Sequence, residues 1–184
     1  MLHAFPCGTL PLDFVGTLRA RRDDPPRERL TGPARLDAWF VESGLLDLAP
    51  GAGEVDLGLA LDLREAIYSL VAARLHDGPP PPDAVAELNL HASGRPVTLR
   101  LGPDGATRTG SVAQGLATLA RQSVEIVGGA DGALLRECAR PGCTQVYLDR
   151  SRGHRRDWCA MRTCGNRVKA AAYRARRNSG AGIS

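Results

Sequence analysis

Four of the five cysteines of this 184-residue chain lie in one short stretch near its C-terminal end. They form two pairs, Cys138 with Cys143 and Cys159 with Cys164; four residues separate the members of each pair, and fifteen separate the pairs. A tetrahedral site of four thiolates needs two such turns, which the intervening chain brings together. The spacing therefore predicts that the four cysteines bind one metal ion, with Zn²⁺ as the first choice.

The rest of the sequence favours a metal over disulfides. No stretch approaches the roughly 18 apolar residues that span a membrane, and the first residues lack the basic start and apolar run of a secretory signal. We therefore expect a cytoplasmic protein without a membrane partner, in a reducing compartment where disulfides are rare. Disulfides and an iron–sulfur cluster remain the alternatives to zinc. Cys7 stands alone and is expected to be a small buried apolar residue.

Positive charge is concentrated around the paired cysteines. Residues 136–177 carry 12 of the 24 Lys and Arg residues but 3 of the 20 Asp and Glu residues, which gives that segment a charge of +9. The whole chain has a formal charge of +4, so the remainder carries −5. A basic segment attached to an acidic body is typical of a module that binds a polyanion.

Three short motifs around the cysteines carry a family resemblance. They are Cys-Gly-Asn-Arg at 164–167, Leu-Asp-Arg-Ser at 148–151, and Arg-x-Trp-Cys at 156–159. Together they resemble the CGNR zinc-finger family over about 40 residues. That family carries an N-terminal domain called ABATE; Leu10 to Thr17 resembles its start, and Leu36-x-x-Trp39 also fits. The resemblance implies a stress-induced transcription regulator, but Gly16 stands where the family has Asn.

Apolar periodicity predicts the secondary structure before the cysteines. Residues at helical spacing predict helices over about 33–43, 54–77, 83–92 and 112–127. Alternation over 96–101 and a return over 106–109 predict a β-hairpin, and the charged, proline-interrupted segment 18–32 predicts a loop. The buried face of the last helix is expected to include Ala113, Leu116, Ala117, Ala120, Val124 and Val127.

We therefore expect an α+β protein with three segments. Residues 1–132 form a mostly helical ABATE-like domain with a small β-hairpin, residues 133–178 a treble-clef or ribbon-like four-cysteine zinc finger, and 179–184 a flexible tail. The glycines at 128–132 predict the boundary, and the apolar faces predict that 1–132 fold without the finger. In the finger, a strand over 146–149 is expected to pair with 156–158.

The helix predicted after Cys164 has a basic surface. Val168, Ala171, Ala172 and Ala175 form a narrow apolar stripe, expected to pack on the finger. No acidic residue follows Gly165, whereas an ordinary solvated helix mixes both signs. We expect this helix and the preceding loop to bind duplex DNA, with RNA or a protein partner as the alternative. The candidate contacts are Arg152, Arg155, Arg156, Arg162, Arg167, Lys169, Arg174, Arg176 and Arg177.

The N-terminal residues give weaker functional signals. Asp13, Arg64, Glu65, His76 and His91 are candidates for a pocket, but their spacing matches no catalytic motif, so we do not expect an enzyme. The domain is expected to sense a small-molecule effector or to form a homodimer. His154, between the cysteine pairs, is an alternative zinc ligand, but four cysteines already suffice, which favours a loop-tip phosphate contact or simple exposure.

Overall fold

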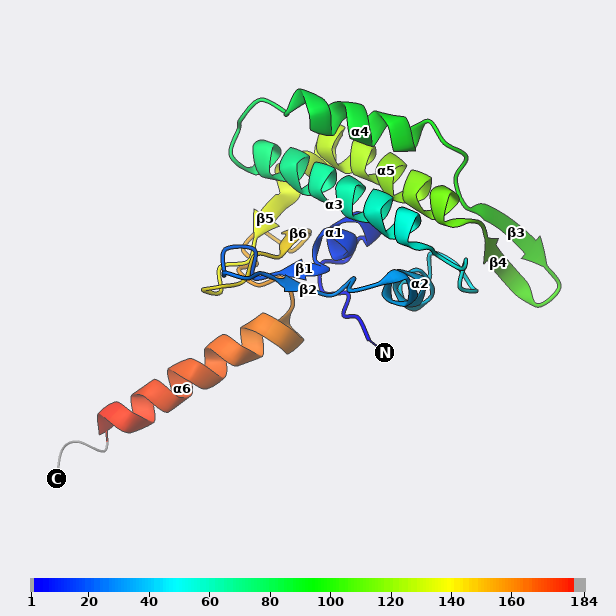
Figure 1. Ribbon diagram of the computed structural model, residues 1–184. Helices are drawn as coiled ribbons and strands as arrows, with labels where there is room; N and C mark the ends of the chain where they lie inside the picture. The colour runs from blue at the N-terminus through cyan, green and yellow to red at the C-terminus, as the bar shows by residue number, and fades with distance from the viewer. Residues whose placement is uncertain (1, 181–184) are drawn as a thin grey trace.

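Three long helices form one layer of the molecule, and the shorter elements lie beneath it (Figure 1). The computed structural model describes residues 2–180, without the side chains of Ala172 and of residues 175–180. Helices α3 (Glu54–Leu75), α4 (Pro82–Ala92) and α5 (Val112–Gly128) pack against one another. The short α1 (Leu10–Val15) contacts α3 and α5, and α2 (Pro33–Glu42) contacts α3.

The local sequence explains where these helices begin. Pro33 opens α2, because its missing N–H has no intrahelical partner to lose in the first turn. Ser111 caps α5 by accepting a hydrogen bond from the Gln114 N–H, and the Gln114 side chain accepts one from the Ser111 N–H. The predicted helices are confirmed, and the apolar residues at helical spacing on α2 and α3 are buried: Leu36, Trp39, Phe40, Leu63, Ile67, Leu70 and Val71.

The buried face of α5 differs in part from the predicted one. Ala113 and Val124, predicted to be buried, are exposed. Val112, Leu119 and Ile126 are buried in addition to the predicted Leu116, Ala117 and Ala120. The reason is that α5 contacts α3, α4 and α1, so its buried face is wider than the single stripe that one neighbour requires.

The segment predicted to be a loop, 18–32, contains a short antiparallel pair. Strand β1 (Leu18–Arg19) pairs with β2 (Arg27–Glu28), with Leu18 opposite Glu28. Strands of two residues are too short to show an alternating pattern, so they could not be predicted from the sequence.

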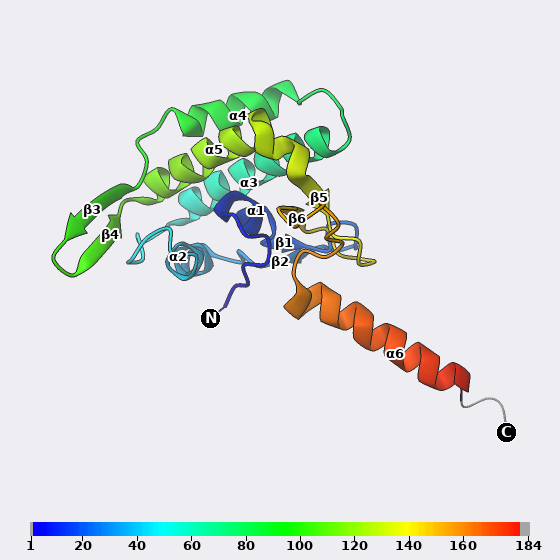
Figure 2. The ribbon, with the colours of Figure 1, turned by 180° about the vertical axis from the view of Figure 1, so that it is seen from behind.

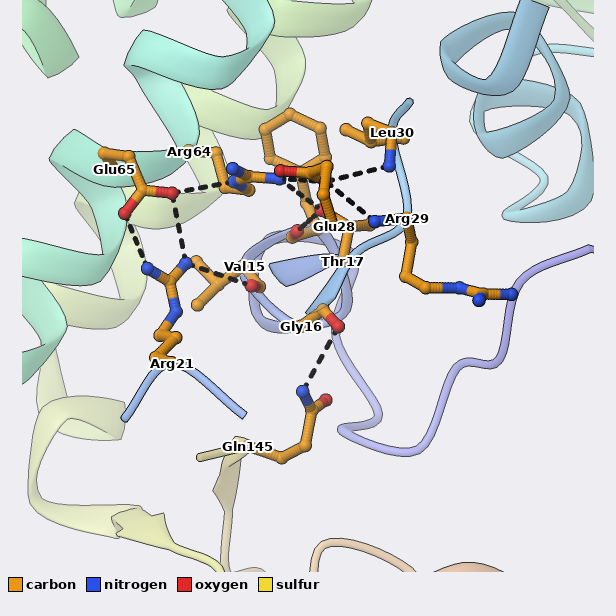
Figure 3. Close-up of polar contacts among 11 residues, drawn as sticks. Val15, Gly16, Thr17, Arg21, Glu28, Arg29, Leu30, Arg64, Glu65 and Gln145 are labelled. Atoms are coloured by element: carbon orange, nitrogen blue, oxygen red, sulfur yellow. Dashed lines mark hydrogen bonds and ion pairs between the residues drawn. The ribbon is translucent and has the colours of Figure 1, made fainter. Parts of the chain in front are cut away.

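Ion pairs attach this β1–β2 hairpin to α3 (Figure 3). The buried Arg64 donates from Nη1 to Glu28 Oε1 at 2.7 Å and to Thr17 Oγ1 at 3.2 Å. Its Nε donates to Glu65 Oε1 at 2.8 Å. Arg21 donates to both carboxylate oxygens of Glu65, at 2.5 and 3.3 Å. Arg64 and Glu65, which were candidates for a pocket, therefore hold the hairpin in place.

The β-hairpin predicted over 96–109 is confirmed, and it projects away from the helices. Strand β3 (Thr98–Gly102) pairs with β4 (Gly105–Thr109), and it projects from the end of the helical layer (Figures 1 and 2). Every residue of both strands is exposed, and the exposed fractions of Leu99 and Leu101 are 64% and 89%.

The cysteine-bearing segment begins with a strand pair different from the predicted one. A 3₁₀ turn (Ala130–Leu134) follows α5, and β5 (Leu135–Glu137) then pairs with β6 (Val146–Leu148). The predicted partner of β6, residues 156–158, forms no strand; instead the Ala139 N–H bonds the carbonyl of Asp157. The first cysteine pair therefore lies within a β-hairpin.

The last helix extends away from the rest of the molecule. A π-helical turn (Met161–Gly165) leads into α6 (Asn166–Gly180), which points outward in both views (Figures 1 and 2). Of the apolar stripe that was predicted to pack on the finger, Val168 is half-buried and Ala171 is exposed, and the side chains of Ala172 and Ala175 lie outside the described residues. Among the described residues, no helix is long and apolar enough to cross a membrane.

The hydrophobic core continues across the predicted boundary at 132/133. Strand β5 contacts α3, β6 contacts α1, and Tyr147 of β6 is fully buried in the same core cluster as Phe14 of α1. The Arg21 N–H donates to Thr144 Oγ1 at 3.2 Å. The boundary itself stays a prediction, but the packing gives both segments one shared core. This arrangement argues against independent folding of residues 1–132.

Candidate metal centre and basic helix

The four cysteines predicted to bind metal converge. Their Sγ atoms lie within 4.8 Å of one another, and all four residues are buried. Cys164 Sγ lies 3.5 Å from Cys159 Sγ and 3.6 Å from Cys143 Sγ, and none of the four forms a disulfide. A Zn²⁺ ion about 2.3 Å from each of four sulfurs places neighbouring sulfurs about 3.8 Å apart. The donor set therefore fits a tetrahedral zinc ion.

Backbone N–H groups lie close to the sulfurs of the first cysteine turn. Gly142 adopts φ +71°, which favours glycine, and the Cys143 N–H bonds the carbonyl of Arg140 at 2.9 Å. The N–H groups of Arg140 and Cys159 bond the sulfur of Cys138, and the N–H of Gln145 bonds that of Cys143. These donors stabilise negative charge on the sulfurs.

The second cysteine turn closes around one carbonyl. The oxygen of Ala160 accepts hydrogen bonds from the N–H groups of residues 163–165, at 3.3, 3.0 and 3.2 Å in chain order. A Cβ on Gly165 would overlap the sulfur of Met161 and lie 3.2 Å from Trp158 Cδ1. The glycine of the Cys-Gly-Asn-Arg motif thus allows Trp158 and Met161 to pack directly against the turn that carries Cys164.

Four thiolates this close need a cation to offset their mutual repulsion. The hydrogen bond between Cys159 and Cys143 lowers the pKa of Cys143 to about 4 and raises the pKa of Cys159 far above its usual range, because one thiol must keep its proton for the other to lose it. Burial also raises the pKa of Cys138. A divalent metal removes this conflict, since it stabilises all four thiolates together.

An arginine that sequence reasoning missed contacts the cluster. Arg140 Nε donates to Cys164 Sγ at 3.1 Å, and it lies between the first two cysteines in sequence. By contrast, Arg167 of the Cys-Gly-Asn-Arg motif is exposed. The position of Arg140 in the Cys-x-Arg-Pro-Gly-Cys sequence placed it near the metal site. Its contact with Cys164 could not be predicted, because that cysteine is 24 residues away in the chain.

Asp149, in the Leu-Asp-Arg-Ser motif, organises the loop between the two cysteine turns. Its Oδ1 accepts from the Ser151 hydroxyl at 2.6 Å and the Ser151 N–H at 3.0 Å, and its Oδ2 accepts from the Arg156 N–H at 3.0 Å. These bonds lower the pKa of Asp149. His154 Nδ1 bonds the Asp149 carbonyl at 2.7 Å, and the metal-binding cluster found among the described residues does not include it.

Arg156, which was predicted to contact nucleic acid, makes its hydrogen bonds within the protein. Its guanidinium donates to the carbonyls of Trp158 at 2.7 Å, Pro6 at 3.4 Å and Cys159, and it stacks on the Tyr147 ring with 4.5 Å to the centroid. The side chain is therefore committed to joining the N-terminal segment, β6 and the second cysteine turn.

The other described candidates are available to a partner. The exposed residues are Arg152, Arg155, Arg162, Arg167, Lys169 and Arg174. Three of them lie on α6, which contacts the π-helical turn that carries Cys164. The side chains of Arg176 and Arg177 lie outside the described residues.

The remaining N-terminal candidates have local roles. Asp13 Oδ1 accepts from the Cys7 N–H at 2.8 Å, and burial raises the pKa of Asp13 to about 6. His91 pairs with Glu87 one turn earlier in α4, with 3.1 Å between Nε2 and Oε1, and His76 ends α3 on the surface. Cys7 is buried, as expected. These residues do not form a metal-binding cluster among the residues the structure describes.

Comparison with protein families finds two matches that together cover most of the chain. Residues 8–130 match the ABATE family, described as "Putative stress-induced transcription regulator". Residues 135–177 match the CGNR zinc finger. A search of curated proteins finds no match. The family and the zinc finger implied by the sequence motifs are both confirmed.

Proposed function

The chain belongs to the ABATE family and carries a zinc-binding CGNR finger, and on this basis we propose that it regulates transcription by binding duplex DNA. Cys138, Cys143, Cys159 and Cys164 are the proposed zinc ligands. The proposed DNA surface is α6 with the exposed arginines that precede it, namely Arg152, Arg155 and Arg162.

The observation that supports DNA binding most strongly is the position and charge of α6. The helix projects from the body, and its described side chains from Lys169 onward are exposed (Figure 1). No acidic residue occurs between Gly165 and Ser184 to form the intrahelical ion pairs that support a solvated helix. An isolated helix of 15 residues is marginally stable in water. A bound polyanion supplies the negative charge that this basic helix lacks.

The proposed role of zinc is structural. When bound, Zn²⁺ crosslinks the two cysteine turns and contributes to the folding free energy of this segment. Cys164 directly precedes the first residues of α6, so the metal fixes the start of the basic helix relative to β5 and β6. Arg140 offsets part of the negative charge of the thiolates.

DNA binding is tested by selecting sequences from a random duplex library with the full-length zinc-loaded protein. We expect enrichment of a sequence motif and weaker binding to structured RNA of equal length. A triple variant, Arg162→Gln, Lys169→Gln and Arg174→Gln, is expected to lose the enrichment. The matched control, with Arg95→Gln, Arg100→Gln and Arg108→Gln in and around the distant β3–β4 hairpin, is expected to retain it.

Stronger binding to RNA, or equal enrichment with both triple variants, would favour the alternative of an RNA- or protein-binding module. The proposed role of the N-terminal domain is either sensing of a small-molecule effector or homodimerisation. Sedimentation velocity across a concentration series tests the dimer directly, because a monomer at all concentrations contradicts it.

A further inference from the structure

A basic cavity lies between the β1–β2 hairpin and the two cysteine turns. Its volume is about 400 Å³, within the range of about 300–1,000 Å³ that is typical of small-molecule sites. Cys143, Cys159 and Cys164 line one part of it, but a single ion held among four sulfurs fills little of this volume. The remaining space separates the hairpin from the first turn of α6.

The charge of the walls is strongly positive. The lining includes five arginines and one acidic residue, namely Arg19, Arg27, Arg29, Arg140, Arg167 and Asp23. Zinc bound by four thiolates carries a net charge of about −2. This cluster and Asp23 offset three of the five arginines, so two positive charges remain without a counter-charge in the cavity. Such an excess favours an anion of matching charge.

Two of the arginines that line the cavity have no counter-charge of their own. Arg19 makes no ion pair with any of the described residues, and its Nε has no hydrogen-bond partner among them. Arg167, at the start of α6, likewise has no ion pair among the residues that the structure describes. By contrast, Arg140 donates to Cys164 Sγ and Arg29 to the Leu2 carbonyl.

We propose that this cavity binds a small molecule with two negative charges, of the phosphate monoester or dicarboxylate class, with Arg19 and Arg167 as direct contacts. Guanidinium groups bind both kinds of anion through paired, charge-assisted hydrogen bonds. The ligand connects the N-terminal hairpin to the first turn of the basic helix, because its two contacts come from these two elements. Binding at this site does not depend on the proposed DNA binding.

The test is isothermal titration calorimetry on full-length zinc-loaded protein at constant ionic strength. The probes are inorganic phosphate, glycerol 3-phosphate and succinate, with glycerol and acetate as uncharged and singly charged controls. We expect saturable binding of one dianion per chain and weaker or no binding of the controls. Arg19→Gln and Arg167→Gln are each expected to weaken binding about tenfold or more, because each loses a charge-assisted contact.

Matched variants separate a site from general charge effects. Arg100→Gln, the same charge change on the distant β3–β4 hairpin, is expected to change affinity by less than about twofold, as is usual for a distant exposed position. Arg19→Lys is expected to bind more tightly than Arg19→Gln because it keeps the charge. Zinc content and the unfolding midpoint establish that each variant is folded. The exposed Arg167 serves as the test position if Arg19→Gln does not fold.

Three results would overturn the proposal. The first is that no dianion shows saturable binding. The second is that the wild type and the Arg19→Gln and Arg167→Gln variants bind the probe with equal affinity. The third is that duplex DNA displaces the probe and that Arg19→Gln weakens DNA binding as much as it weakens probe binding. The last result would make the cavity a contact for the DNA backbone.

Discussion

The side chain of Gln145 occupies the space that a side chain at Gly16 would need. Gln145 Nε2 donates to the Gly16 carbonyl at 3.2 Å, and a Cβ on Gly16 would overlap Gln145 Oε1 (Figure 3). Gly16 ends α1, and Gln145 directly precedes β6, so the pair joins the ABATE domain to the zinc hairpin. A side chain at position 16 therefore has no room beside this glutamine in its present position.

Gly16→Ala is expected to lower the free energy of unfolding by about 1–3 kcal/mol, because the added methyl group displaces Gln145. The backbone at Gly16, with φ −69°, accommodates alanine without strain. A loss of stability therefore reports the contact between the added methyl group and Gln145. In a Gln145→Ala background the loss is expected to shrink by at least about 0.5 kcal/mol. Gly58→Ala, in an open part of α3, is the control and is expected to be neutral or stabilising. Additive effects of the two substitutions in urea unfolding would contradict this account.

Loss of zinc is expected to destabilise the N-terminal domain as well as the finger. The chain has two tryptophans, Trp39 in α2 and Trp158 beside Cys159, so Trp158→Phe leaves one reporter in the N-terminal core. In that background, Cys138→Ser is expected to abolish stoichiometric zinc binding and to lower the unfolding midpoint reported by Trp39 fluorescence. Because β5 and β6 share the core with α1 and α3, an unchanged midpoint would instead show that the two segments fold independently.

Asp13 is expected to make stability fall as the pH rises from about 4 to about 6. Burial raises its folded-state pKa to about 6, above an unfolded value of about 3.9, so the folded state holds a proton that the unfolded state has lost. The predicted loss is about 2–3 kcal/mol relative to Asp13→Asn, which does not titrate. Measuring both proteins at saturating zinc cancels the pH dependence of metal binding. Parallel stability curves for the two proteins would show that Asp13 keeps a normal pKa.

Arg155 and Arg156 are adjacent but are expected to respond differently to substitution. Arg156→Ala should lower stability by about 1–3 kcal/mol, because it removes bonds to three carbonyls and the stacking on Tyr147. Arg155→Ala, at an exposed position, should change stability by less than about 0.5 kcal/mol and weaken DNA binding. Thermal unfolding and DNA titration of both variants check this. Equal stabilities would return Arg156 to the candidate DNA contacts.

The metal centre was the part of the molecule most open to sequence reasoning. Each tight turn carries two cysteines, so local spacing reveals the ligand set without knowledge of the fold. The long helices were also predictable, since each shows an apolar period over several turns. Helix α6 was expected from the residues after Cys164, but its outward direction depends on packing that a periodic stripe does not reveal.

Contacts between distant residues could not be predicted in the same way. Gln145 and Gly16 are 129 positions apart, and Arg140 and Cys164 are 24 apart. Strand β6 pairs with 135–137 rather than 156–158, and strands of three residues are too short for alternation to choose between partners. Arg155 and Arg156 have the same chemistry in sequence, and only the folded positions of Tyr147 and of three backbone carbonyls distinguish their roles.

The salt dependence of DNA binding tests the central claim most directly. If about four to six phosphates contact the basic surface, log K for a duplex should fall with log salt at a slope of about −4 to −5 between about 50 and 200 mM salt. Replacing Lys169 and Arg174 together with Gln should weaken binding and flatten the slope by about 2 if both contact phosphate, whereas Arg95→Gln with Arg100→Gln should leave the slope unchanged. A slope near zero for the wild type, or wild-type affinity in the Lys169 and Arg174 double variant, would contradict DNA recognition by α6.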